Sequence, residues 1–156
     1  MSQRCLALDP GNSIGWVVRD YDGKLYGGTI GECHKAVYEL LCIWNPEVIV
    51  YETFQMYPGK AQKLIWNTFY PVEVIGVIKL WHMMHPVYTD YDLAAQMGDI
   101  VSCSRKLVGL QPSVKKYALS NNELDLWKTV DRKGQAATEH LRDAVRLLRY
   151  YERNPQ

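Results

Sequence analysis

Residues 5–19, CLALDPGNSIGWVVR, contain the pattern that decides the fold. An apolar run over residues 5–9 ends in a carboxylate, a Pro-Gly turn follows at once, and a β-branched and aromatic run covers residues 14–19. Runs of this kind, joined by turn residues, are typical of neighbouring strands. Asp22-Gly23 then predicts a tight turn into a third strand over residues 24–30. We therefore expect an antiparallel meander of three strands.

Further along the chain, helical and extended patterns alternate. Residues 32–44 place apolar side chains at helical spacing, and Asn45-Pro46 stops that helix. Residues 48–51 are continuously apolar, as in a buried parallel strand, and Glu52 follows at its carboxyl end. The largely apolar residues 61–84 predict a long helix that Pro71 interrupts or begins anew.

The C-terminal half completes an α/β pattern. We expect a strand over residues 86–91, a short helix near residues 93–97, a helix from Ser113, and a final amphipathic helix that follows Gly134 and ends near Tyr151. We assign no element between residue 97 and Leu110. The order predicts an α/β fold with a five-stranded mixed sheet, in which two parallel strands join the meander and helices flank the sheet.

Composition limits the class of protein. At 156 residues and 47% hydrophobic content, we expect one domain over residues 1–156 with a single core. No apolar stretch approaches the roughly 18 residues of a membrane span, and Asp9 comes too early for a secretory signal. The four cysteines form no C-x-x-C pair, which favours reduced thiols and a cytoplasmic location.

The net charge of +1 hides an uneven distribution. Residues 1–59 carry four Lys or Arg against seven Asp or Glu, so the basic surplus lies in residues 60–156. A basic surplus downstream is compatible with a face that binds a polyanion, although charged helices are more often solvated surfaces.

Acidic or imidazole side chains fall at the ends of three predicted elements. Asp9 and Glu52 each end a strand, and a charge at the end of a buried strand is costly unless it is paired, solvated or bound to a metal. His140 and Asp143 are three residues apart on a helix and hence on one side of it. Taken singly, Asp before Pro-Gly is ordinary turn chemistry, and a His-Asp pair is often a solvated face. The set as a whole suits the oxygen-rich coordination of Mg²⁺ or Mn²⁺.

The succession of these motifs resembles that of the RuvC-type Holliday-junction resolvases of the ribonuclease H-like superfamily, in particular short phage-encoded members. That family opens with an apolar strand, Asp-Pro-Gly, and a Gly that precedes an aromatic residue. It continues with an acidic residue after an apolar strand and closes with a helical Asp-or-His, then Asp-Ala. The matching residues are Asp9, Pro10, Gly11, Gly15, Trp16, Glu52, His140, Asp143 and Ala144.

The resemblance implies a metal-dependent endodeoxyribonuclease with a ribonuclease H-like fold. Asp9, Glu52, His140 and Asp143 would be the catalytic residues and the ligands of two Mg²⁺ or Mn²⁺ ions, one of which activates water while the other stabilises the leaving 3′ oxygen. The resemblance favours His140 as a metal ligand; the alternative is that its imidazole acts as a proton shuttle or tunes the second metal. The implied reaction is resolution of Holliday junctions and related branched DNA, by a homodimer that makes paired symmetric nicks. If phage-encoded, the protein would act in the host cytoplasm.

The resemblance also indicates DNA contacts. Basic residues would bind phosphates and aromatic residues would stack on an opened base. The candidates are Phe54, Tyr57, Lys60, Lys63, Arg105, Lys106, Lys115 and Lys116. The small residues that pair subunits in the family are replaced here by Trp66, Phe69, Tyr70 and Pro71, which leaves the dimer geometry open.

Three other functions remain as alternatives. The same metal centre would serve a broader nuclease that cuts forks, flaps or structured RNA. A junction-binding protein without catalysis would share the DNA surface. An actin-like nucleotide binder also uses an Asp-x-Gly turn against phosphate, although this chain has no length for the second lobe of such proteins. The sequence predicts neither the cut-site preference nor the branch type.

Overall fold

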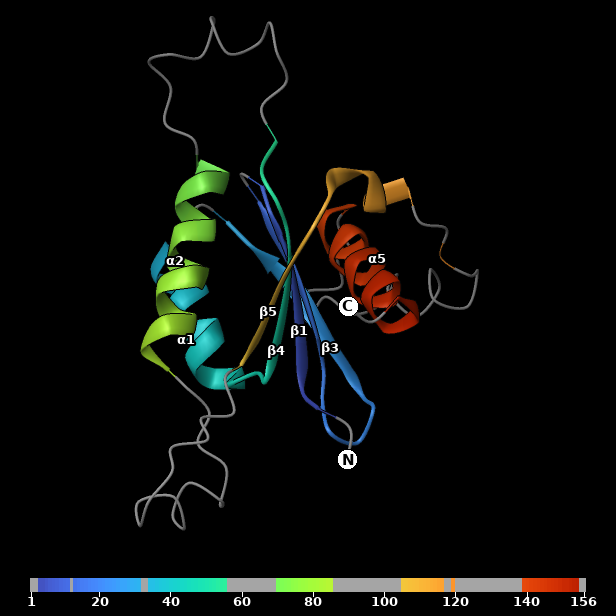
Figure 1. The fold of residues 1–156 in the computed structure, drawn as a ribbon, viewed down its shortest axis with the longest axis horizontal. Helices are drawn as coiled ribbons and strands as arrows, with labels where there is room; N and C mark the ends of the chain where they lie inside the picture. The colour runs from blue at the N-terminus through green and yellow to red at the C-terminus, as the bar shows by residue number, and fades with distance from the viewer. Residues whose placement is uncertain are drawn as a thin grey trace, which may run out of the picture.

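The first strand of the chain lies at the centre of a five-stranded sheet (Figure 1). The computed structural model describes residues 3–11, 13–31, 34–55, 70–85, 105–116, 119 and 139–154. Their strands are β1 (Cys5–Pro10), β2 (Ile14–Arg19), β3 (Leu25–Ile30), β4 (Val48–Glu52) and β5 (Lys106–Leu110), in the order β3-β2-β1-β4-β5. β1, β2 and β3 pair antiparallel, whereas β4 and β5 run parallel to β1. The mixed sheet expected from the sequence is confirmed.

Helices cover both faces of the sheet, as Figure 1 shows. α1 (His34–Trp44) and α2 (Tyr70–Met84) lie on one face, and α5 (Glu139–Arg153) lies on the other beside the short 3-10 helix η2 (Pro112–Lys116). α1 ends at Trp44; Asn45, which follows it, has a left-handed φ of 44°, and Pro46 cannot extend the helix. Pro71 is the second residue of α2, where a proline is tolerated. None of the described helices has the length and apolar character of a membrane span.

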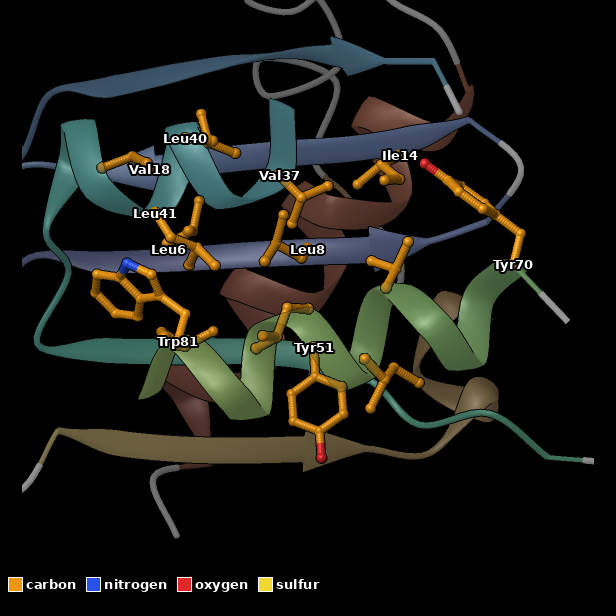
Figure 2. Close-up of a cluster of buried hydrophobic side chains, with 14 residues drawn as sticks. Leu6, Leu8, Ile14, Val18, Val37, Leu40, Leu41, Tyr51, Tyr70 and Trp81 are labelled. Atoms are coloured by element: carbon orange, nitrogen blue, oxygen red, sulfur yellow. The ribbon is translucent and has the colours of Figure 1, made fainter. Parts of the chain in front are cut away.

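Two apolar clusters fix the helices to the sheet. Side chains alternate along a strand, so Leu6 and Leu8 of β1 pack against α1 and α2, whereas Cys5 and Ala7 pack against α5. Figure 2 shows the first cluster, in which Trp81 of α2 is fully buried. Truncating a buried leucine of this kind costs roughly 2–5 kcal/mol. By the same alternation Asp9, which follows Leu8, lies on the face that α5 covers.

The fifth strand is the main difference from the sequence prediction. β5 occupies residues to which no element was assigned, and it contains Gly109. A Cβ at Gly109 would lie 2.7 Å from Thr53 Cγ2 and 3.2 Å from the Tyr51 hydroxyl, so the glycine leaves room for side chains of the preceding strand and its end. The strand expected over residues 86–91, the helix near residues 93–97 and the first part of the long helix, residues 61–69, lie outside the described residues. Of the helix expected from Ser113, the structure describes η2 over residues 112–116, and residues 117–118 and 120–138 lie outside the described residues.

Candidate active site

The ends of two parallel strands bring Asp9 and Glu52 to neighbouring positions. Leu8 of β1 pairs with Tyr51 of β4, so the next residue on each strand is a carboxylate at the same level of the sheet. Leu8 and Tyr51 face α1 and α2, and alternation therefore turns Asp9 and Glu52 toward α5. Leu110, the β5 partner of Glu52, indeed lies in the cluster against α5. Asp9 is 2% exposed, so one of these carboxylates is buried.

A glycine on the next strand lets α5 approach the end of the sheet where β1 and β4 finish, here called the Asp9 edge. Gly15 of β2 is the register partner of Asp9. A Cβ at Gly15 would lie 1.8 Å from the carbonyl oxygen of His140 and 2.6 Å from the backbone nitrogen of Leu141. The first turn of α5 therefore crosses directly over Gly15, where no side chain fits. This approach brings the Nδ1 atom of His140 to 3.5 Å from Oδ2 of Asp9.

Asp143 lies one turn further along α5, on the same side as His140. The surrounding helix face packs into the core, and Asp143 is only 9% exposed. Its Oδ1 atom accepts a hydrogen bond from Nη1 of Arg146, three residues further on. Asp143 thus lies on the buried side of α5, with one carboxylate oxygen engaged by a guanidinium.

The donor chemistry of these side chains fits a divalent cation. Two carboxylates at adjacent strand ends repel one another when both are ionised, and a bound cation offsets that repulsion. Carboxylate oxygens suit Mg²⁺ and Mn²⁺, and the imidazole of His140 is a further possible ligand. Among the residues that the structure describes, however, no three His, Cys, Asp or Glu side chains converge closely enough to hold an ion. In the structure His140 lies beside Asp9, whereas Asp143 accepts a hydrogen bond from Arg146.

The predicted DNA contacts are distributed over both edges of the sheet. Phe54 follows β4 at the edge of Asp9 and is 39% exposed. Lys115 and Lys116 belong to η2, which follows β5 at the same edge and packs against α5. Lys106 is exposed at the start of β5, the opposite edge, where its Nζ lies 5.5 Å from the ring centroid of Tyr151. Tyr57, Lys60 and Lys63 lie outside the described residues.

Arg105 has a structural role in place of the phosphate contact expected from the sequence. It is 6% exposed, and its guanidinium donates hydrogen bonds to the carbonyl oxygens of Pro46 and His85 and to Oδ1 of Asn45. The same group lies 4.6 Å from the ring centroid of Trp81, a stacking contact. Burial lowers the pKa of Arg105. This arginine joins the segment after α1, the end of α2 and the start of β5.

Replacing Arg105 by Ala is expected to destabilise the protein by about 3 kcal/mol, because three acceptors, among them the buried carbonyl of Pro46, lose a charged donor. Urea unfolding monitored by circular dichroism measures the change. Lys106→Ala is the control, since its exposed side chain predicts a change of about 0.5 kcal/mol or less. Equal stability of the two variants would contradict the structural role of Arg105.

The sequence prediction gave no structural role to two residues that shape the site. Gly15 was matched as part of a motif, but its contact with the backbone of α5 depends on a helix more than a hundred residues away. Arg146 carried a local signal, because an Asp and an Arg three residues apart on a helix commonly pair. Both residues determine where the predicted ligands lie.

Comparison with known proteins identifies the fold. No family model and no curated protein sequence matches this chain. T. thermophilus RuvC in complex with a Holliday junction substrate matches with a TM-score of 0.57 over 99% of this chain and 97% of that chain, at 15% identity. A second Thermus thermophilus RuvC structure gives 0.50 over 96% and 95%, at 17% identity. The Fowlpox virus Holliday junction resolvase gives 0.50 over 96% and 99%, at 11% identity. The chain therefore has the fold of RuvC-type resolvases, as the sequence predicted.

Proposed function

We propose that this protein is a divalent-metal-dependent endonuclease that resolves Holliday junctions by paired symmetric nicks. The observation that carries the proposal is the placement of Asp9 and Glu52 at neighbouring strand ends, with His140 beside Asp9, in a fold like that of RuvC. A buried carboxylate at a strand end, such as Asp9, contributes little to a core and is costly without a counter-charge. Its position is therefore better explained by chemistry than by stability. The whole chain, residues 1–156, would form one nuclease domain.

In this proposal Asp9, Glu52, His140 and Asp143 would hold two Mg²⁺ or Mn²⁺ ions. Such ions supply an activated water and stabilise the leaving 3′ oxygen of a phosphodiester. Asp9 provides a buried negative charge on a rigid strand, and its register with Gly15 fixes its distance from α5. His140, 45% exposed at its side chain, is reachable by a ligand or by solvent while it faces Asp9. His140 serves as a metal ligand or, in the alternative role, as a proton shuttle.

The DNA would lie along the edge that carries these residues. Lys115 and Lys116 are residues of η2, which packs against α5, and Phe54 follows the end of β4. We propose that these lysines, with Lys60 and Lys63, bind phosphates, and that Phe54 and Tyr57 stack on bases near the branch. Lys106 would be an outer contact, because its strand begins at the other edge.

The matching structures support a branched-DNA substrate, since one is a RuvC bound to a Holliday junction. The alternative is a broader nuclease of forks, flaps or structured RNA, and the net charge of only +1 favours it. Cleavage rates on an immobile four-way junction, a Y-fork, a linear duplex and an RNA–DNA hybrid distinguish the two. Strong preference for the junction supports the proposal, and equal cutting of fork and junction would replace it with the alternative.

We further propose a homodimer whose contact lies on the outer side of α2. Val72, Leu80, Met83 and Met84 are large apolar residues exposed on this helix. A Cβ at Gly76, which lies among them, would meet nothing within 4 Å, so a second helix would find room there. Several large exposed apolar side chains on one helix are the kind of surface that a second protein covers. A two-fold dimer would present two identical sites to opposing strands.

Leu80→Glu combined with Met83→Glu is expected to convert this dimer to a monomer, because four carboxylates, two from each protomer, would have to be buried in one apolar contact. Sedimentation velocity at micromolar protein concentrations measures the change. Ile43→Glu on α1 is the control, since Ile43 and Met83 are both 76% exposed. A wild-type protein that stays monomeric on junction DNA would contradict the dimer.

A cytoplasmic location, in a host cell if the chain is phage-encoded, completes the proposal. Cys5 and Cys42 are free thiols, which suits a reducing compartment. Burial raises the pKa of the Cys5 thiol to about 12, so this group stays protonated and unreactive at physiological pH.

A further inference from the structure

Asp143, a candidate metal ligand, pairs with Arg146, a cation of the protein itself. Nη1 of Arg146 donates to Oδ1 of Asp143. The side chains are 22% and 13% exposed, respectively, so solvent screens the pair only in part. A hydrogen bond between a guanidinium and a carboxylate is among the stronger ones in proteins.

A second pair on the same helix provides a comparison. Arg149 donates to Glu152 with the same spacing of three residues, and those side chains are 25% and 17% exposed. Spacing, helix and exposure are thus nearly the same in the two pairs. The difference is the acceptor, because Asp143 is a candidate ligand near the edge of Asp9, whereas Glu152 lies near the other end of α5 and also pairs with Arg19.

A cation that binds Asp143 must displace or approach this guanidinium. The oxygen that accepts the Arg146 hydrogen bond keeps a second lone pair, but an ion bound there would lie next to the guanidinium charge. An ion on the other oxygen would be only a few ångströms from a positive charge, and like charges at such distances repel strongly where water is partly excluded. This engagement also agrees with the failure of three ligands to converge among the described residues.

We propose that Arg146 is a resident competitor for divalent ions at Asp143, which weakens their binding and raises the ion concentration that the site requires. The proposal rests on the proposed metal-dependent function. Arg146 acts through Asp143 and is a positioning residue. When an ion takes Asp143, the guanidinium is released beside the catalytic edge.

The test is a titration of Mn²⁺ alone into the full-length protein, with free Mn²⁺ measured by electron paramagnetic resonance. Arg146→Gln keeps much of the side chain and removes the charge, and we expect it to lower the Kd for Mn²⁺ about tenfold. Arg149→Gln, the matched control, is expected to leave the Kd unchanged. Circular dichroism and the unfolding midpoint verify that each variant is folded, and the readout needs no cleavage.

Each outcome has a distinct meaning. If wild type binds Mn²⁺ and Asp9→Asn does not, but Arg146→Gln binds with unchanged or weaker affinity, the competition is overturned and the metal centre stands. Equal tightening by Arg149→Gln would also overturn it, because the effect would then be general electrostatics along α5. If wild type shows no saturable Mn²⁺ binding, the proposed metal centre fails and the competition fails with it.

Discussion

Asp9→Asn is expected to reduce cleavage of a four-way junction by roughly a thousandfold, the size of effect that follows when several kcal/mol of metal-dependent stabilisation are lost. The amide keeps the shape of the side chain and removes its charge. Asp9 is buried beside His140 and at the level of Glu52, so the substitution removes a charge from the middle of the proposed ligand set. Single-turnover cleavage of a labelled junction in Mg²⁺ measures the loss.

Binding separates loss of chemistry from loss of the DNA surface. The same variant is expected to bind the junction within about threefold of wild type and with the same salt dependence, because the basic residues are unchanged. Asp22→Asn is the control for the substitution itself. Its side chain is 49% exposed in the turn before β3, where it accepts a hydrogen bond from the backbone of Lys24, and cleavage should be unaffected. Full activity of Asp9→Asn would remove Asp9 from the catalytic site.

Gly15→Ala is expected to destabilise the protein by about 3 kcal/mol, because the added methyl group meets backbone and not a flexible side chain. The new carbon would lie 1.8 Å from the carbonyl oxygen of His140, so the first turn of α5 must move. That movement separates His140 from Asp9, and we expect cleavage to fall as well. Urea unfolding gives the stability, and cleavage is measured at a temperature where the variant remains folded.

Gly31→Ala is the matched control for this prediction. Gly31 follows β3 at the same edge of the sheet, and a Cβ there would meet nothing within 4 Å. Its stability and cleavage should equal those of wild type. A Gly15→Ala protein with wild-type stability and wild-type cleavage would show that α5 does not depend on this glycine for its position.

Local patterns made the first half of the fold predictable. β1 and β2 are continuous apolar or β-branched runs bounded by turn residues, and α1 is stopped by Asn45 and Pro46. β5 was not predicted because Gly109 weakens its strand pattern. The reason for that glycine is the space needed by Tyr51 and Thr53, which belong to a segment more than fifty residues earlier.

The candidate site was predictable where it depended on strand ends and helix spacing. Asp9 and Glu52 end parallel neighbours, so their common edge follows from strand order, and His140 and Asp143 share a helix side. The basic surplus could not distinguish surface from buried arginines. Arg105 binds carbonyl groups of two distant segments, and such contacts exist only once the chain has folded.

The most direct test of the account is to map nicks on a four-way junction labelled on each of its four strands in turn. We predict paired nicks at equal distances from the branch point on two opposing strands, in the presence of Mg²⁺ or Mn²⁺ and not in EDTA. Binding without nicks, or cutting of all strands and of linear duplex at similar rates, would contradict a metal-dependent junction resolvase.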